Sequence, residues 1–65
     1  MIAKVVTVRD CKAVLTSGGQ ERYTVDLPKG TILLVQKDKG TYYITRIKGT
    51  AVRVNVSKTD VAPVN

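Results

Sequence analysis

The side chains best suited to chemistry are the cations in the second half of the chain. Lys and Arg number eleven against five Asp and Glu, a formal net charge of +6, and residues 34–65 hold most of this excess. Such charge attracts phosphates and acidic surfaces, so we expect nucleic acid, DNA or RNA, or an acidic protein surface as the partner. The residues expected to make these contacts are Lys37, Lys39, Tyr42, Arg46, Lys48, Arg53 and Lys58. The alternative is that the cations only keep a small β-protein soluble and protect its sheet edges.

Two adjacent tyrosines, Tyr42 and Tyr43, offer a ring on which a base can stack. Successive side chains of a strand point to opposite faces, so only one of the two can belong to a nucleic-acid-binding surface. The alternative is that one ring lies in the core and the other covers an edge. Binding of this kind depends on charge and reads the bases little.

Catalytic and metal-binding side chains are scarce. The chain has no histidine, which removes the commonest general base and the commonest metal ligand. Its acids are scattered, and neither Ser17-Gly18-Gly19 nor any Gly-rich loop has the context of a nucleophile elbow or a phosphate-binding loop. We therefore expect a non-catalytic protein with no cofactor and no metal site.

Cys11 is the one cysteine, so it has no partner for an internal disulfide. Two interpretations are open. Cys11 is a reactive thiol whose thiolate is favoured by Arg9 and Lys12, or it is a small, partly buried side chain.

The N-terminal residues alternate in polarity and lack the cleavage site of a secretory signal. No apolar run approaches the roughly 20 residues that cross a bilayer, so we expect no membrane partner. The expected location is the cytoplasm of a bacterial or archaeal cell or of an infected host. A chain of 65 residues that begins with Met1 also resembles small phage or bacterial proteins in size.

Valine, isoleucine, threonine and tyrosine dominate short runs separated by glycine-containing turns, which is typical of strands. The expected strands are Ile2–Val8, Lys12–Thr16, Arg22–Val25, Thr31–Gln36, Thr41–Ile47 and Thr50–Val56, with a final stub at Val61–Val64. The turns are expected at Ser17–Gln20, Pro28–Gly30, Lys39–Gly40 and Lys48–Gly49. Residues 57–60 favour a single 3₁₀ turn. The chain is thus predicted to be one all-β domain, residues 1–65, of five to six short antiparallel strands.

Alternation assigns the strand faces. Val52, Val54 and Val56 point one way, which predicts a strand with one buried side. The run Ile32–Val35 is continuously apolar, and we favour its full burial in a small barrel. The alternative is an exposed strip, centred on Ile32 and Leu34, through which two copies associate as a homodimer.

Over most of its length the chain resembles an SH3 domain. Residues 25–33 are similar to the middle motif of that family, Thr41-Tyr42-Tyr43 falls at its paired tryptophans, and residues 56–61 fall at its closing 3₁₀ turn. The resemblance implies an SH3-like small barrel with one 3₁₀ turn before the last strand. It also implies a core, whose register in residues 41–47 is open by one residue, made of Val25, Leu27, Leu33, Val35, Ile44, Val56 and Val61.

The sequence departs from the family at the ligand groove. Arg9 and Asp60 stand where groove tyrosines are expected, and Ser57 stands where a groove proline is expected. The segment 10–22 carries only Asp10 and Glu21 as acids. We therefore expect no polyproline peptide as a partner.

Because SH3-like barrels host unrelated functions, the fold alone assigns none. The function that we expect is nucleic-acid binding through a basic sheet face. The alternatives are a protein-interaction module that uses a groove between residues 10–22 and Lys37–Gly40, or a small phage or viral structural or host-inhibiting protein.

Overall fold

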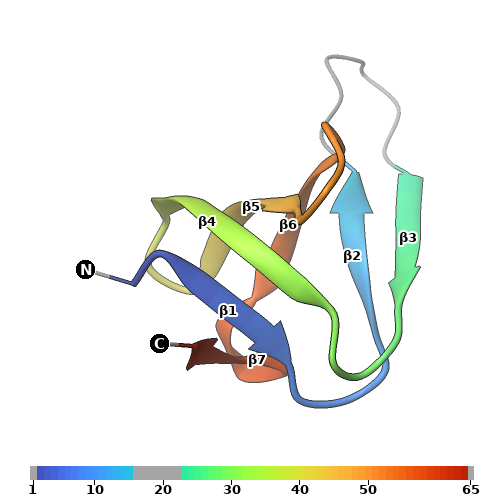
Figure 1. Ribbon diagram of the computed structural model, residues 1–65, viewed down its shortest axis with the longest axis horizontal. Helices are drawn as coiled ribbons and strands as arrows, with labels where there is room; N and C mark the ends of the chain where they lie inside the picture. Colours follow the sequence, from blue (N-terminus) through green and yellow to red (C-terminus); the bar gives the residue numbers. More distant parts are fainter. Residues whose placement is uncertain (1, 16–22, 65) are drawn as a thin grey trace.

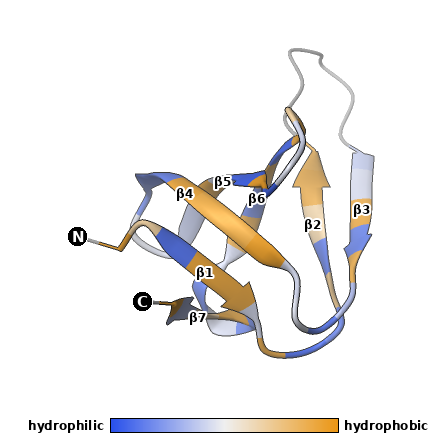
Figure 2. Ribbon diagram, in the orientation of Figure 1, coloured by the Kyte–Doolittle hydropathy of each residue, from blue (hydrophilic) through white to orange (hydrophobic). Residues whose placement is uncertain are grey.

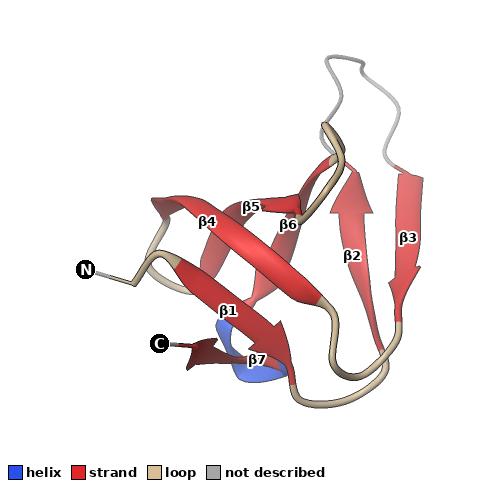
Figure 3. Cartoon of the chain, in the orientation of Figure 1, coloured by secondary structure: helices blue, strands red, loops and turns tan. Residues whose placement is uncertain are grey.

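A computed structural model describes residues 2–15 and 23–64 as one antiparallel sheet with a single 3₁₀ helix (Figures 1 and 3). The strands are β1 (Lys4–Thr7), β2 (Cys11–Leu15), β3 (Tyr23–Leu27), β4 (Ile32–Asp38), β5 (Tyr42–Ile47), β6 (Arg53–Ser57) and β7 (Val61–Val64), and the 3₁₀ helix η1 (Lys58–Asp60) precedes β7. The all-β class and the 3₁₀ turn before the last strand are confirmed. The predicted turn at Ser17–Gln20 lies outside the described residues.

The sheet has seven strands, in the order β3-β2-β6-β5-β4-β1-β7. This exceeds the five to six strands expected, because the final stub pairs with β1 along its whole length. Strands β3 and β7 end the order and do not pair with each other, so the sheet is open and the expected closed barrel is not seen. A register shift between Val35 and Lys37 in β4 marks a β-bulge, which bends that strand.

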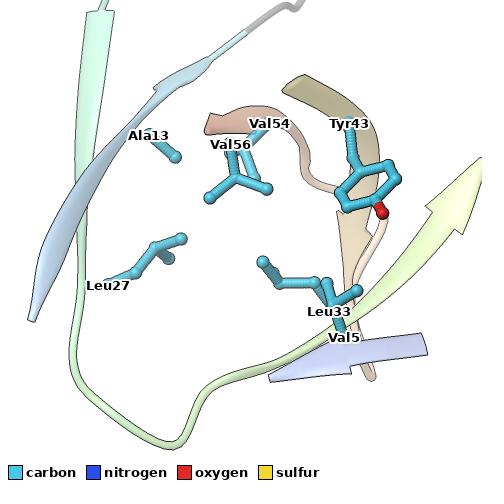
Figure 4. Packing of buried hydrophobic residues seen from close by; sticks show 7 residues of the cluster. All are labelled: Val5, Ala13, Leu27, Leu33, Tyr43, Val54 and Val56. Carbon is cyan, nitrogen blue, oxygen red and sulfur yellow. The ribbon is translucent and has the colours of Figure 1, made fainter. Parts of the chain in front are cut away.

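The sheet curls so that the inner faces of its strands converge on one core (Figure 4). Its buried apolar side chains are Val5, Ala13, Leu27, Leu33, Tyr43, Val54 and Val56. The predictions for Leu27, Leu33 and Val56 are confirmed. Three other predicted core residues, Val25, Val35 and Val61, are partly buried against this cluster.

The prediction for Ile44 is wrong by one position. Tyr43 and Thr45 are buried, whereas Ile44 points to the other face and is half-buried. Thr45 tolerates burial because its hydroxyl donates to the Val54 carbonyl over 3.0 Å. Sequence alternation alone could not exclude this register, because Tyr42 and Ile44 on one face are no less apolar than Tyr43 and Thr45 on the other.

The predicted full burial of Ile32–Val35 is also wrong. Only Leu33 is fully buried, and Ile32, Leu34 and Val35 are half-buried. β4 is paired along both edges, with β1 and β5. Its inner face packs on the core, whereas its outer face has no second layer of described residues over it. Figure 2 shows hydrophobic residues along much of β4.

Thr7 fixes the turn between β3 and β4 from the inside. Its buried hydroxyl donates to the Pro28 carbonyl and accepts from the Thr31 amide, each over 2.8 Å. Asp10 accepts from the Lys29 amide at the same turn over 2.8 Å. These bonds hold the start of β4 against the end of β1. They therefore help to fix the register of β4, which lies at the centre of the candidate site.

Candidate nucleic-acid interface

Two arginines face each other on the outer side of the sheet. Tyr43 and Thr45 of β5 point into the core, so Arg46 points outward. Arg46 lies directly opposite Arg53 of β6, whose neighbour Val54 is buried. Opposed residues of an antiparallel pair have Cβ atoms about 4.5–5.5 Å apart, so the two guanidinium groups can reach one anion.

The same register continues across the sheet. Leu34 of β4 lies opposite Arg46, and Lys4 of β1 lies opposite Leu34. We call Lys4, Leu34, Arg46 and Arg53 the arginine row. Adjacent strands are about 4.8 Å apart, so the row spans about 14 Å from Lys4 to Arg53.

Arg46 and Arg53 carry like charges at directly opposed positions of the row. Like charges directly opposite one another destabilise a strand pair. Arg46 is held in place because its Nη1 donates to the Thr50 carbonyl over 2.7 Å. A bound anion would offset the repulsion, and the guanidinium fork suits an anion with several oxygens.

Two further predicted site residues lie on this outer face. Lys37 of β4 is exposed and lies opposite Ile44. Tyr42 of β5 is half-buried and lies opposite Ser57. Tyr42 is thus the tyrosine on the outer face, and Tyr43 is in the core. This agrees with the expectation that the two rings lie on opposite faces of the strand.

Lys39 and Lys48 lie in turns at opposite ends of β5. Both side chains are exposed. The Lys39 amide donates to the Tyr42 carbonyl over 2.9 Å, and the Lys48 amide donates to the Ile32 carbonyl over 3.2 Å. They extend the positive surface beyond the row but are not aligned with it.

Lys58 is placed differently from the other predicted site residues. Its ammonium lies 2.7 Å from Asp38 Oδ1 and 4.8 Å from the centroid of the buried Tyr43 ring. The pKa of Asp38 is lowered, first by the hydrogen bond from Lys58 and then by that from the Gly40 amide. Lys58 therefore ties η1 to β4, and the structure does not bring it into the arginine row.

One member of the row, Lys4, was missed by the sequence reasoning. Lys4 lies in the first strand, outside the residues 34–65 that hold most of the charge excess. The alternation of Lys4 and Val6 with the buried Val5 and Thr7 was the available signal, because it puts Lys4 on an outer face.

The two positions where the resemblance implied groove tyrosines hold an ion pair. Arg9 Nη1 lies 2.9 Å from Asp60 Oδ1 and also donates to the Thr59 carbonyl over 2.5 Å. The Val8 amide donates to the Asp60 carbonyl over 2.9 Å. The pair therefore fastens the loop after β1 to η1.

Cys11 is half-buried and packs against the core. Burial raises the pKa of its thiol, and the charge of Asp60 raises it further, while Arg9 acts in the opposite direction. These shifts favour the protonated thiol over the reactive thiolate.

Cys11 also lines a hollow of about 390 Å³ with Asp10, Lys12, Asp26, Leu27 and Pro28.

The described ranges lack two further kinds of feature. No three His, Cys, Asp or Glu residues there are grouped so as to hold a metal ion. No helix within residues 2–15 and 23–64 has the length and apolar character to cross a membrane.

Comparison with protein-family models, curated proteins and solved structures finds no match. The function must therefore be inferred from the geometry of the chain itself.

Proposed function

We propose that the chain is a non-catalytic module that binds nucleic acid through the outer face of β4, β5 and β6. The observation that carries the proposal is the direct opposition of Arg46 and Arg53. Two like charges held together on a fixed sheet are costly by themselves and become favourable when a phosphate lies between them.

The surroundings of the arginine row support backbone contacts rather than base reading. Lys4 extends the row on β1, and Lys37, Lys39 and Lys48 add charge around it. The half-buried Tyr42 offers one ring edge or face for a base. Such an arrangement takes its affinity from neutralised phosphates and has little means of distinguishing sequences.

The test is binding of random-sequence oligonucleotides, DNA and RNA, across a salt series. If about four phosphates are neutralised, affinity falls about hundredfold between about 50 and 200 mM salt. Arg46→Ala and Arg53→Ala should each reduce the slope of log affinity against log salt by about 0.9. Lys29→Ala, in the turn after β3, removes one charge away from the row and serves as the matched control.

Binding that does not change with salt would disprove this function. Equal losses from Lys29→Ala and Arg46→Ala would show that net charge matters and the row does not. Thermal unfolding of each variant confirms that the fold is retained.

We propose further that the fold is related to the SH3-like barrels, with its sheet left open between β3 and β7. Support comes from the order of its elements, because the β2–β3 hairpin, the turn at residues 28–31, η1 and β7 follow one another as the resemblance implies. Without matched relatives, this assignment depends on that order and on the shared core positions Leu27, Leu33 and Val56.

A second candidate function is binding of an acidic protein. Val6 lies opposite Ile32, two residues along the strands from the Lys4–Leu34 pair. Val6, Ile32 and Leu34 are half-buried on the outer face. This apolar strip beside Lys4 and Arg46 suits a segment with both acidic and apolar side chains. A synthetic peptide of alternating Glu and Leu is the probe, and Ile32→Gln should weaken its binding more than that of an oligonucleotide.

A further inference from the structure

The two edges of the open sheet differ in how well they are protected. β7 has four residues, and its Pro63 has no amide to donate. β3 has five residues, contains no proline and carries no Lys or Arg. Among the described strands, β3 is paired with β2 only, and Figure 1 shows it at the margin of the molecule. β3 is therefore the edge that is open to strand addition.

We propose that two copies of this chain associate through β3, antiparallel and edge to edge, about a two-fold axis that passes Val25. A two-fold axis makes each contact occur twice and closes the assembly at a dimer. The inference is independent of the proposed nucleic-acid function.

The sequence of β3 is complementary to itself in this register. Thr24 comes opposite the partner subunit's Asp26, so a hydroxyl can donate to a carboxylate at two symmetric places. Thr24 and Asp26 are both exposed, so these contacts require no opening of the core. Like charges do not meet anywhere along the shared edge.

The ends of the strand are matched as well. Tyr23 is 56% exposed and comes opposite the partner subunit's Leu27. In each copy Leu27 lines the hollow of about 390 Å³, with Cys11 and Pro28 beside it. Pairing therefore brings an exposed aromatic ring to the rim of a partly apolar hollow.

Local charge does not oppose association at this edge. Two chains of net charge +6 repel each other. β3 has one acid and no cation, and β2 separates it from β6, the nearest strand of the arginine row. Two copies that pair here bring no Lys or Arg of one β3 against another, and their basic faces stay open to other partners.

The test is sedimentation equilibrium of the full chain from about 10 μM to 2 mM, because a single strand edge buries far less than a standard interface and the dimer will be weak. The wild type is expected to rise from the 7.1 kDa monomer toward twice that mass. A monomer mass throughout the series overturns the proposal.

Two substitutions at Thr24 test the register of the paired β3 strands, because they are expected to change the dimer affinity in opposite directions. Thr24→Lys places an ammonium opposite the partner subunit's Asp26 and should tighten the dimer about three- to tenfold. Thr24→Asp places two carboxylates there and should weaken it by a similar factor.

Thr41→Lys and Thr41→Asp, in the turn before β5, make the same charge changes away from β3. If the Thr24 and Thr41 pairs shift the dimer equally, association is through another surface or reflects net charge, and the proposal is wrong.

Discussion

The cations around η1 and those of the arginine row lie in opposite electrostatic settings. At η1 each cation meets an acid, Arg9 with Asp60 and Lys58 with Asp38. In the row Arg46 meets Arg53. We call the two ion pairs at η1 the η1 clamp.

The difference separates two uses of positive charge in one small protein. In the η1 clamp the cations join segments that are far apart in sequence and so support the fold. In the row the charges are concentrated on one outer face, which is expected of a surface that binds anions. Stability and affinity should therefore respond to different cations.

The largest effect is expected from Arg46→Glu. A glutamate opposite Arg53 replaces repulsion with attraction, so the free energy of unfolding should stay within about 1 kcal/mol of the wild type. Oligonucleotide affinity should fall about tenfold or more, because a phosphate contact is lost and a negative charge is added beside the site. Fluorescence anisotropy and chemical denaturation measure the two quantities.

The control for this change is Lys58→Glu, which makes the same charge reversal in the η1 clamp. It should destabilise the fold by placing a carboxylate near Asp38, and it should cost less affinity than Arg46→Glu. If both substitutions lower affinity equally, the arginine row has no special role.

A smaller effect is expected from Lys58→Ala. Loss of the ammonium over the Tyr43 ring alone should lower the free energy of unfolding by about 0.5–1 kcal/mol. Lys39→Ala removes an exposed charge from the neighbouring turn and should leave stability nearly unchanged. Urea denaturation compares the two, and equal stabilities would mean that Lys58 contributes only net charge.

The strands and the 3₁₀ turn could be predicted because the information is local. Glycines at Gly40 and Gly49 take positive φ angles of 88° and 84° and end strands where the sequence indicated. The register of β5 could not be predicted in the same way, since Tyr42 and Ile44 are apolar on the outer face. Closure of the barrel was also not settled by local patterns, because it depends on whether two edge strands meet.

The site was predictable in composition and not in arrangement. Charge alone singled out Arg46 and Arg53, but their opposition depends on the length of the turn between β5 and β6. Lys58, in η1, was grouped with them because its partner Asp38 lies 20 positions earlier, in β4. Arg9 likewise pairs with a residue 51 positions away. Long-range pairs of this kind have no signature in a single sequence.

The smallest effect is a pH dependence that belongs to the η1 clamp alone. The pKa of Asp38 is lowered from its ordinary value of 3.8 by the hydrogen bonds from Lys58 and Gly40. A carboxylate with a lower pKa in the folded state adds stability above its unfolded pKa, and this stability is lost as the pH falls through its folded pKa. Asp38→Asn should therefore lower the melting temperature at pH 6 and have less effect as the pH falls below about 3. Arg46→Ala removes neither the Asp38 carboxylate nor its hydrogen-bond donors, so it should shift the melting curve equally at both pH values. A pH-dependent difference for Arg46→Ala, or none for Asp38→Asn, would contradict the separation of the two regions.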